Sequence, residues 1–349
     1  MKVLNYLAVV IFVVLVFYLL FIGKDLLLPL VIAIALWYLI LTLGNAFSRV
    51  SIGQFQLPRP VCLLASFFTY IALAWLVINF LSSTVDDVLE IAPVYQQNLN
   101  ARLESLSFVD IGEYEGQSFG QLLSNWIDIP AYARSIATSL TSILASGGLI
   151  LIYLGFLFLE QGHFSKKLSA LVTDPTREED VKKLLNRIRD DIQKYVIIKV
   201  FTSSLTGILS YVFLRFMEVD FAGVWGLIIF LLNFIPTVGS LVATIFPALI
   251  AFAQSDGYTL FLAVLSGIGL IQICIGNILE PRLTGSSFNL SPIVILLNLA
   301  LWGYIWDIPG MFLCVPFLII ITIVFSHFPQ TRPIAVMLSS DGKLRTTID

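Results

Sequence analysis

The residues best suited to chemistry in this sequence are carboxylate, amide and basic side chains that interrupt apolar stretches. The strongest group is the segment Gly276-Asn-Ile-Leu-Glu-Pro-Arg282. Asn277 and Glu280 are three residues apart, so on an α-helix they would share one face, and Pro281 is expected to end that helix. Glu280 is then either the partner of Arg282 in a local ion pair or a carboxylate whose protonation is coupled to transport. The residues alone leave both roles open.

Lys199 is a second candidate because it lies one turn into an apolar stretch, 195–217. A charge near the bilayer centre costs at least about 2.5–3.5 kcal/mol, so such a lysine needs a partner, a hydrated path or an aqueous surface within reach. Small and polar residues follow it, namely Thr202-Ser-Ser204 and Thr206-Gly207. They allow close helix packing or line a hydrated path. Two interpretations follow: an amine that extends to the membrane surface, and one that faces a polar path inside the protein.

A third candidate is a break in an apolar tract. Phe221–Ala253 is too long for one crossing, and Asn233-Phe-Ile-Pro-Thr-Val-Gly239 interrupts it. Pro236 removes a backbone donor and Gly239 loosens the helix, so we expect two shorter helices around an unwound centre. Leu290–Phe328 is interrupted in the same way. Unwound backbone at membrane depth must be satisfied by protein or by a watery cavity, as in the discontinuous helices that build substrate sites in transporters.

Motifs of nucleotide-driven and metal-dependent enzymes are missing. The chain has no Gly-x4-Gly-Lys-Ser/Thr loop and no His-Glu-x-x-His pair. The histidines and cysteines are isolated from one another, which argues against a zinc site or a disulfide framework. They are His163, His327, Cys62, Cys274 and Cys314. We therefore expect no enzymatic activity and no metal or cofactor, apart from coupling to a proton or sodium gradient.

The composition is typical of a membrane protein. Of the 349 residues, 58% are hydrophobic, against roughly 45–50% in soluble proteins, and only 12% are charged. The mean hydropathy is +0.92. A soluble globule of this size would need more charged residues to cover its exterior. The formal net charge of −3 gives no basic excess for a phosphate backbone, so nucleic-acid binding is not expected.

Apolar runs of about the 20 residues that cross a bilayer recur along the whole chain. The first is too long for the apolar part of an export signal and is expected to be a retained span. The runs are Val3–Ile22, Leu26–Gly44, Val61–Ser82, Ile143–Glu160, Tyr195–Met217, Phe221–Ala253, Tyr258–Leu279 and Leu290–Phe328, the last interrupted at Gly303–Gly310. The sequence therefore predicts an all-α polytopic membrane protein of about eight transmembrane helices, with two tracts broken or re-entrant.

The charges of the loops predict the orientation. Acidic residues dominate 83–140 and basic residues are frequent in 161–194, so by the positive-inside rule the first lies outside and the second inside. Both are expected to be helical, the inner one opening with a capping box at Thr176-Arg-Glu-Glu179. The predicted organisation is N-terminal transmembrane helices 1–82, an extracytoplasmic helical insert 83–140, a transmembrane helix 141–160, a cytoplasmic amphipathic segment 161–194, a transmembrane transport core 195–328 and a cytoplasmic tail 329–349. Both termini are then cytoplasmic.

Four segments carry a family resemblance. They are Asn233-Phe-Ile-Pro-Thr-Val-Gly239, Gly276-Asn-Ile-Leu-Glu-Pro-Arg-Leu-Thr-Gly285, Leu290-Ser-Pro292 and Pro309-Gly-Met-Phe-Leu-Cys-Val-Pro316. They resemble the signature segments of the AI-2E transporter family, also called the autoinducer-2 exporter family. The resemblance spans nearly the whole chain and implies a multi-pass protein of the bacterial inner membrane. Members are described as exporters of the furanosyl signal autoinducer-2, and some as sodium or proton antiporters.

The resemblance also implies which residues line a substrate or ion pathway. The positions that match the family's motifs are Lys199, Asn233, Pro236, Gly239, Asn277, Glu280 and Arg282. One position departs from the family, because Asp307 stands where a glycine is expected before Ile308-Pro-Gly310. Its carboxylate either adds a charge at the outer mouth of the pathway or lies among the lipid headgroups.

Three functions are compatible with these observations. The first is a secondary transporter that exports a small polar metabolite, with autoinducer-2 as the candidate, in which Asn233 and Asn277 supply hydrogen bonds and Glu280 couples an ion. The second is a sodium/proton antiporter with the same carboxylate as ion ligand. The third is a non-transporting membrane scaffold, which would tolerate substitution of these residues. The expected partners are a small-molecule or ion substrate and membrane lipids, and self-association stays open because Ser203 and Gly207 form a small-xxx-small pair.

Overall fold

The described part of the chain is helical. The computed structural model describes residues 2–49, 58–105, 129–172, 174–255, 257–285 and 288–344. Within these ranges every regular element is a helix, and strand-like pairing is limited to one bridge between Leu290 and Ser339. The all-α prediction is confirmed.

Several of the described helices are long and apolar enough to cross a membrane. The five long ones are Lys24–Ser48, Arg59–Thr84, Pro175–Phe216, Tyr258–Thr284 and Pro292–His327, and the three shorter apolar ones are Val10–Ile22, Ala222–Leu232 and Val238–Gln254. The protein is therefore a multi-pass membrane protein, as predicted. The number of about eight crossings stays a prediction.

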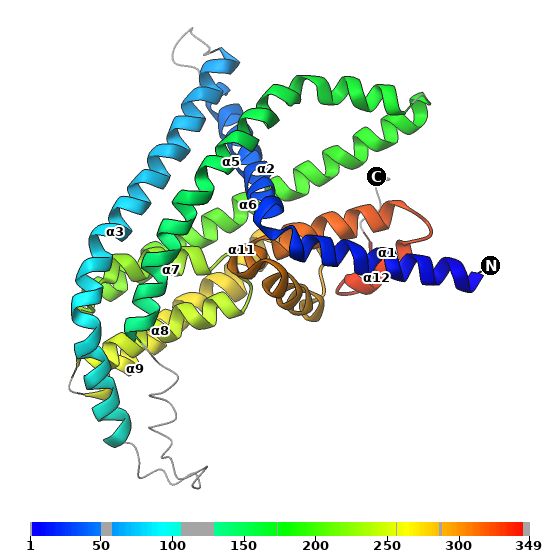
Figure 1. Cartoon of the computed structure of the whole chain (residues 1–349). Coiled ribbons are helices and arrows are strands. Elements are labelled where there is room, and N and C mark those ends of the chain that lie inside the picture. The colour runs from blue at the N-terminus through cyan, green and yellow to red at the C-terminus, as the bar shows by residue number, and fades with distance from the viewer. Residues whose placement is uncertain are drawn as a thin grey trace. The chain divides into compact units, whose positions relative to one another are not determined.

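The chain forms two compact units. One comprises Met1–Ile71, Ala145–Val196 and Ser286–Asp349, and the other comprises Ala72–Leu144 and Ile197–Gly285. The helices of the first unit (Figure 1) are α1 (Lys2–Ile22), α2 (Lys24–Ser48), α11 (Pro292–His327) and α12 (Arg332–Leu338). Those of the second unit are α7 (Ala222–Leu232), α8 (Val238–Gln254), α9 (Tyr258–Gln272), the π-helix η1 (Ile273–Leu279) and α10 (Glu280–Thr284). Three long helices contribute to both units, namely α3 (Arg59–Ser105), α5 (Ile129–Leu171) and α6 (Pro175–Phe216). Residues 106–128 of the predicted insert lie outside the described residues.

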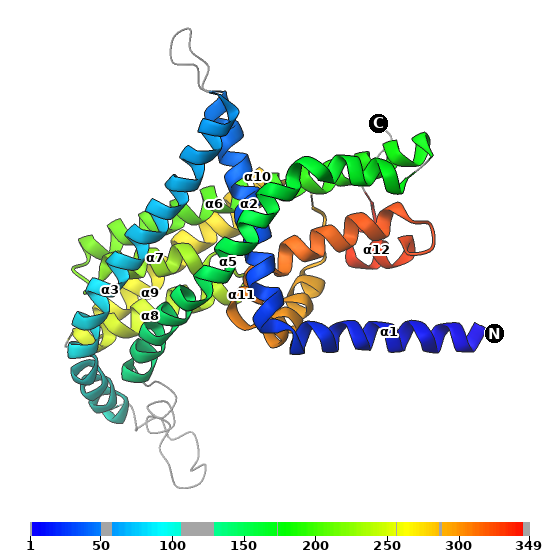
Figure 2. The same cartoon turned by 45° about the horizontal axis from the view of Figure 1, so that its top comes forward.

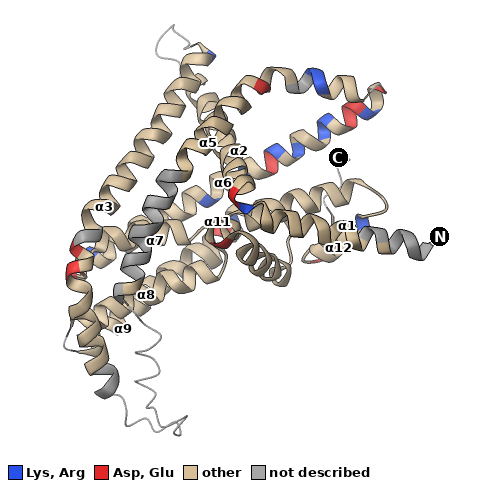
Figure 3. Cartoon of the chain, in the orientation of Figure 1, with Lys and Arg blue, Asp and Glu red and all other residues tan. Residues whose placement is uncertain are grey.

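Helix α6 joins two predicted elements into one. The expected cytoplasmic helix and the apolar stretch after it form a single continuous helix, and its charged residues are concentrated in its first half (Figure 3). The predicted capping box is wrong. The backbone N–H of Thr176 donates to Asp174 Oδ1 at 3.0 Å and its hydroxyl donates to the same oxygen at 2.7 Å. Asp174 thus caps the helix, with Pro175 as its first residue, and these hydrogen bonds lower the pKa of Asp174.

The first predicted break is present in the second unit. Helix α7 ends at Leu232 and α8 begins at Val238, with a tight turn between them. A Cβ on Gly239 would lie 1.9 Å from the carbonyl oxygen of Leu232, so this turn requires glycine. The eleven residues of α7 extend only about 16 Å, less than the roughly 30 Å of a bilayer's hydrocarbon core.

Small residues let α8 pack closely on its neighbour. Ala243, Ala248 and Ala251 are fully or almost fully buried, together with Val264 and Ile268 of α9. Figures 1 and 2 both show α8 and α9 side by side. This apolar contact holds the short helices of the second unit together.

The second predicted break lies in α11, at Asp307, where the family resemblance predicts a glycine. Trp306 (φ −128°, ψ 19°) and Asp307 (φ 52°, ψ −140°) interrupt the helix. Glycine adopts the Asp307 conformation readily and other residues rarely do, so the glycine expected at this position has a backbone reason. The Asp307 carboxylate forms an ion pair with Lys24 at the start of α2, and the Trp306 indole donates to the carbonyl of Leu20 at 3.1 Å.

We predict that Asp307→Gly is more stable than Asp307→Ala by about 1–2 kcal/mol, because alanine keeps the strained backbone whereas glycine relaxes it. Both variants lose the ion pair with Lys24, so that loss cancels in the comparison. In an ordinary helical position the order is reversed, with alanine better by about 1 kcal/mol. Thermal unfolding of the two variants in detergent measures the difference. An alanine variant as stable as the glycine variant would show that Asp307 is not strained.

Candidate functional site

One face of α6 is polar and buried although it belongs to an apolar segment. Its residues recur at helical spacing and therefore lie on one side of the helix. This polar stripe consists of Lys199, Thr202, Ser203, Thr206 and Ser210, and all five residues are buried. The other faces of the same helical segment expose large apolar side chains. A membrane helix that is apolar on its other faces and polar on one buried face turns that polar face to the interior of the protein. The stripe covers eleven residue steps, or about 16 Å.

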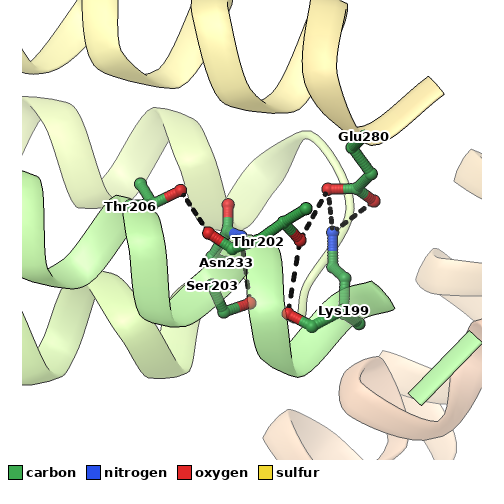
Figure 4. Close-up of polar contacts among 6 residues, drawn as sticks. All are labelled: Lys199, Thr202, Ser203, Thr206, Asn233 and Glu280. Atoms are coloured by element: carbon green, nitrogen blue, oxygen red, sulfur yellow. Dashed lines mark hydrogen bonds and ion pairs between the residues drawn. The ribbon is translucent and has the colours of Figure 1, made fainter. Parts of the chain in front are cut away.

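The most charged contact of the stripe is an ion pair between Lys199 and Glu280 (Figure 4). The Lys199 amine donates to Glu280 Oε1 at 2.8 Å and to Oε2 at 3.0 Å, and the Thr202 hydroxyl lies 3.4 Å from Oε2. The lysine side chain is 9% exposed, so it does not extend to the membrane surface, whereas the carboxylate side chain is 24% exposed. Glu280 is paired with Lys199 rather than with Arg282, so the predicted local ion pair with Arg282 is wrong.

The helix that carries Glu280 differs from the prediction. Ile273–Leu279 is a π-helix, whose i→i+5 hydrogen bonds widen the turn, so Asn277 and Glu280 do not have the α-helical relation expected from their spacing. Asn277 is exposed, as is Arg282. Pro281 does not end the helix but lies in the first turn of α10, which continues to Thr284. Pro281 lacks the N–H that would bond the carbonyl of residue 277, which is a local cause of the wider turn.

The break between α7 and α8 brings a second polar contact to the stripe. Asn233 is buried, and its Nδ2 donates to the Ser203 hydroxyl at 3.0 Å (Figure 4). Pro236 lies in the turn and Gly239 lies at the start of α8, and neither has a polar side chain to offer a solute, so their role is to shape the backbone. The break therefore places Asn233 in contact with α6, and the end of the π-helix places Glu280 in contact with the same helix.

Two buried polar residues of this unit, Ser210 and Gln272, were not singled out in the sequence at all. The Ser210 hydroxyl extends the stripe, and Gln272 lies at the end of α9, just before the π-helix. Within the described chain, neither the Ser210 oxygen nor the Gln272 Nε2 has a hydrogen-bond partner. The signal for Ser210 was available, because it continues the three- and four-residue spacing that starts at Lys199. Gln272 is a lone polar residue whose neighbours in sequence gave no second position to pair with it.

Close helix packing is also part of the stripe. A Cβ on Gly207 would lie 2.8 Å from the carbonyl oxygen of Gly226, and a Cβ on Gly226 would lie 2.7 Å from Tyr211 Cβ. These two glycines let α6 and α7 approach each other backbone to backbone. The close-packing interpretation therefore applies at Gly207, and the hydrated path stays a prediction.

The charged part of the site is one carboxylate paired with one amine. A carboxylate paired with an amine changes its partner when it binds a proton or a cation, because either one competes with the lysine for the same oxygens. The described residues contain no group of three or more histidine, cysteine, aspartate or glutamate side chains that would hold a metal ion. The site therefore offers an ion pair at Glu280 and hydrogen-bonding groups along the stripe.

Comparison of the sequence with known proteins shows the family of the chain. The sequence model of AI-2E family transporters matches residues 7–330. The chain belongs to this family. It is 31% identical over 294 residues to the AI-2 transport protein TqsA of Escherichia coli K12, covering 83% of this chain and 84% of that one. A protein of Borreliella burgdorferi named for transport, without a stated solute, is 27% identical over 89% of this chain and 83% of its own length.

A further relative from Haemophilus influenzae, also named for transport alone, is 24% identical over 82% of this chain and 83% of its own length. These similarities confirm the family resemblance. They identify this AI-2E protein as a membrane transporter and so disfavour the scaffold hypothesis.

We predict that Ser203→Ala lowers the free energy of unfolding by about 1–3 kcal/mol, because it leaves the buried Nδ2 of Asn233 without its partner. Adding Asn233→Ala should cost less in this background than in the parent, since the same hydrogen bond is lost only once. Ser204→Ala, one residue along and off the stripe, serves as the control. Chemical or thermal unfolding of the parent, the two single variants Ser203→Ala and Asn233→Ala, and the double variant gives the coupling energy between the two side chains. Strict additivity would mean that the two side chains do not interact.

Proposed function

We propose that this protein is a secondary transporter that exports a small polar metabolite across the bacterial inner membrane, with autoinducer-2 as the solute. The observation that carries the proposal is the Lys199–Glu280 ion pair at one end of a buried polar stripe. Buried charges in a membrane segment are costly, and a protein keeps them where they do work such as ion coupling. The name of TqsA states AI-2 transport for that relative, and this supports the choice of solute here.

In the proposed mechanism Glu280 is the coupling group. A proton or sodium ion arriving at its partly exposed carboxylate weakens the pair with Lys199. The amine then needs another acceptor, and the hydroxyls of the stripe or an oxygen of the solute can take that place. Asn233 provides donors and acceptors for a solute rich in hydroxyl groups, and the Thr202 and Thr206 hydroxyl oxygens provide acceptors, since the Thr206 hydroxyl already donates to the carbonyl of Thr202 at 2.8 Å. The broken pair α7–α8, which carries Asn233 to the site, supplies a part that moves during alternating access.

The predicted orientation is part of the proposal. The charge distribution favours cytoplasmic N- and C-termini, with 161–194 cytoplasmic and 83–140 outside, by the positive-inside rule. Helix α7 is about 16 Å long, which favours a re-entrant α7–α8 pair over a full hairpin. The transport core, 195–328, then contains both the polar stripe and the two broken tracts.

A sodium/proton antiporter is the alternative, and one observation favours it. The carboxylate of Glu280 is more exposed than its lysine partner, so a small cation reaches it without displacing the polar stripe. In this mechanism the hydroxyl oxygens of the stripe contact the transported ion, and no metabolite binds there. The same residue carries both versions, and they differ in whether an organic solute moves.

The test uses the purified full chain in liposomes loaded with autoinducer-2, with or without an imposed proton or sodium gradient. The exporter predicts efflux that accelerates with the gradient and that an unrelated solute of the same size does not compete with. The antiporter predicts that added sodium collapses a pH gradient when no autoinducer-2 is present. Absence of gradient-dependent efflux would refute the exporter, and sodium-dependent collapse would then establish the antiporter.

A further inference from the structure

The buried residues of α9 and of the π-helix change their spacing just before Glu280. Up to that point they recur at the α-helical interval of three or four. They are Val264, Ile268, Gln272 and Ile275. An α-helix would bring residue 278 or 279 to this face next. Instead it is Glu280, five positions after Ile275, whose side chain meets Lys199 of α6.

The π-helix accounts for this longer interval. The backbone N–H of Glu280 donates to the carbonyl of Ile275, five residues earlier, where an α-helix would use the carbonyl of Gly276. The π-helical segment therefore holds one residue more than an α-helix along the same path, and every side chain after it is turned by one residue's rotation, about 100°. On a helix with a diameter of about 10–12 Å, this rotation moves the end of a side chain by about 8 Å. Without the π-helix, Leu279 would occupy the place of Glu280.

Pro281 is placed where it opposes an α-helical path through this segment. In an unbroken α-helix its ring would clash with the carbonyl of Asn277, and that carbonyl would have no N–H to bond. The π-helix ends at Leu279, two residues before the proline, and α10 continues from Glu280. Pro281 is exposed, so its ring fills no space in the core. The proline therefore acts on the backbone rather than through packing.

We infer that Pro281 is a positioning residue of the Lys199–Glu280 ion pair: it holds Ile273–Leu279 in the π-helical form, and this form turns Glu280 toward Lys199. In Pro281→Ala the segment winds as an α-helix, Leu279 takes the place of Glu280, and the carboxylate turns away from the amine. This role deepens the proposed function and rests on it for what the ion pair does. The position of the pair is tested without any transport.

The first test measures whether Lys199 and Glu280 still interact when the proline is replaced. Chemical unfolding of the purified full chain in detergent gives a double-mutant cycle of Lys199→Met and Glu280→Gln. In the parent the two substitutions should be strongly non-additive, because they remove the same ion pair. In Pro281→Ala they should become additive. Leu283→Ala, at an exposed position of the same short helix, keeps the proline and should keep the non-additivity of the parent.

The second test exchanges two neighbouring residues to follow the rotation. The double substitution Leu279→Glu/Glu280→Leu moves the carboxylate back by one position. In the parent it should remove the interaction with Lys199, and in Pro281→Ala it should restore it, which a merely structural role of the proline would not produce. The readout is the non-additivity between Lys199→Met and replacement of that carboxylate by glutamine. Pro281→Ser, which also restores the N–H, should give the same results as Pro281→Ala.

The positioning role is overturned if Lys199 and Glu280 stay as strongly coupled in Pro281→Ala and Pro281→Ser as in the parent. It is also overturned if the exchange of residues 279 and 280 restores no interaction with Lys199 in those variants. Gradient-driven efflux of autoinducer-2 should fall at least about tenfold in Pro281→Ala, together with the energetic coupling. Unchanged efflux in a variant that has lost the energetic coupling would contradict the proposed role of Glu280 in transport and leave the positioning role intact.

Discussion

We expect Glu280→Gln to reduce gradient-driven export at least about 100-fold, an effect of about 2.7 kcal/mol on the coupled step. Glutamine keeps the shape of the side chain but takes up neither a proton nor a cation, so the gradient has no site at which to act. The substitution also leaves the buried amine of Lys199 without its counter-charge. Efflux from liposomes with and without the gradient gives the ratio directly.

The loss of coupling has to be separated from a loss of folding. Breaking a buried ion pair costs about 3–5 kcal/mol, and here the low end applies because the Glu280 side chain is 24% exposed. The double variant Lys199→Met/Glu280→Gln removes both charges, so it should regain stability but not coupling. Glu218→Gln, at an exposed carboxylate of the same unit, is the matched control and should retain both. Coupled export by the double variant would remove Glu280 from the mechanism.

The second large effect concerns the turn that delivers Asn233. We expect Gly239→Ala to destabilise the protein by about 3 kcal/mol or more, because the new Cβ would lie 1.9 Å from the carbonyl oxygen of Leu232. Backbone atoms cannot move aside as a flexible side chain does, so the turn between α7 and α8 has to open. The folded yield and the thermal unfolding temperature in detergent should both fall sharply.

Gly269→Ala is the matched control for this prediction. Gly269 is a helical glycine of the same unit, and a Cβ there would meet only Thr244 Cγ2 at 4.0 Å, an ordinary contact. Alanine at this position should be neutral or stabilising by up to about 1 kcal/mol, since it favours the helix. If the two variants unfolded at the same temperature, the tight turn would not be a requirement of the fold.

The breaks in the apolar tracts were predictable because their cause is local. Pro236 and Gly239 interrupt one tract, and Asp307 lies in the interruption of the other. Proline and glycine act on the backbone within one turn, so reading them needs no knowledge of the rest of the fold. The conformation of Asp307 required the structure, since its side chain gives no sign of a backbone that suits glycine.

The partners of the polar residues were not predictable in the same way. Lys199 and Glu280 are 81 residues apart, and many carboxylates lie at comparable distances along the chain. The pattern identified both residues as unusual in their apolar surroundings, but only the packing of α6 against the π-helix segment joins them. The prediction that Asn277 and Glu280 share one helix face is wrong for a related reason. It assumed α-helical geometry, and the π-helix before Glu280 changes which side chains share a face.

Helix caps show the same limit on a smaller scale. Thr176 and Glu179 fit the capping-box pattern, yet Asp174 caps α6 because it lies directly before Pro175, which is preorganised for the first helical position. Two overlapping signals competed within a few residues, and the one with the fixed proline φ prevailed.

In the proposed mechanism Glu280 couples ion movement to solute movement, and thermodynamic coupling is reciprocal. The most direct measurement therefore imposes only a gradient of autoinducer-2 across liposomes that contain the full chain and records proton and sodium flux. We expect that solute leaving down its gradient drives a proton or sodium ion in the opposite direction, and that Glu280→Gln abolishes this flux. Solute efflux without any ion movement, or the same ion flux in the variant, would contradict it.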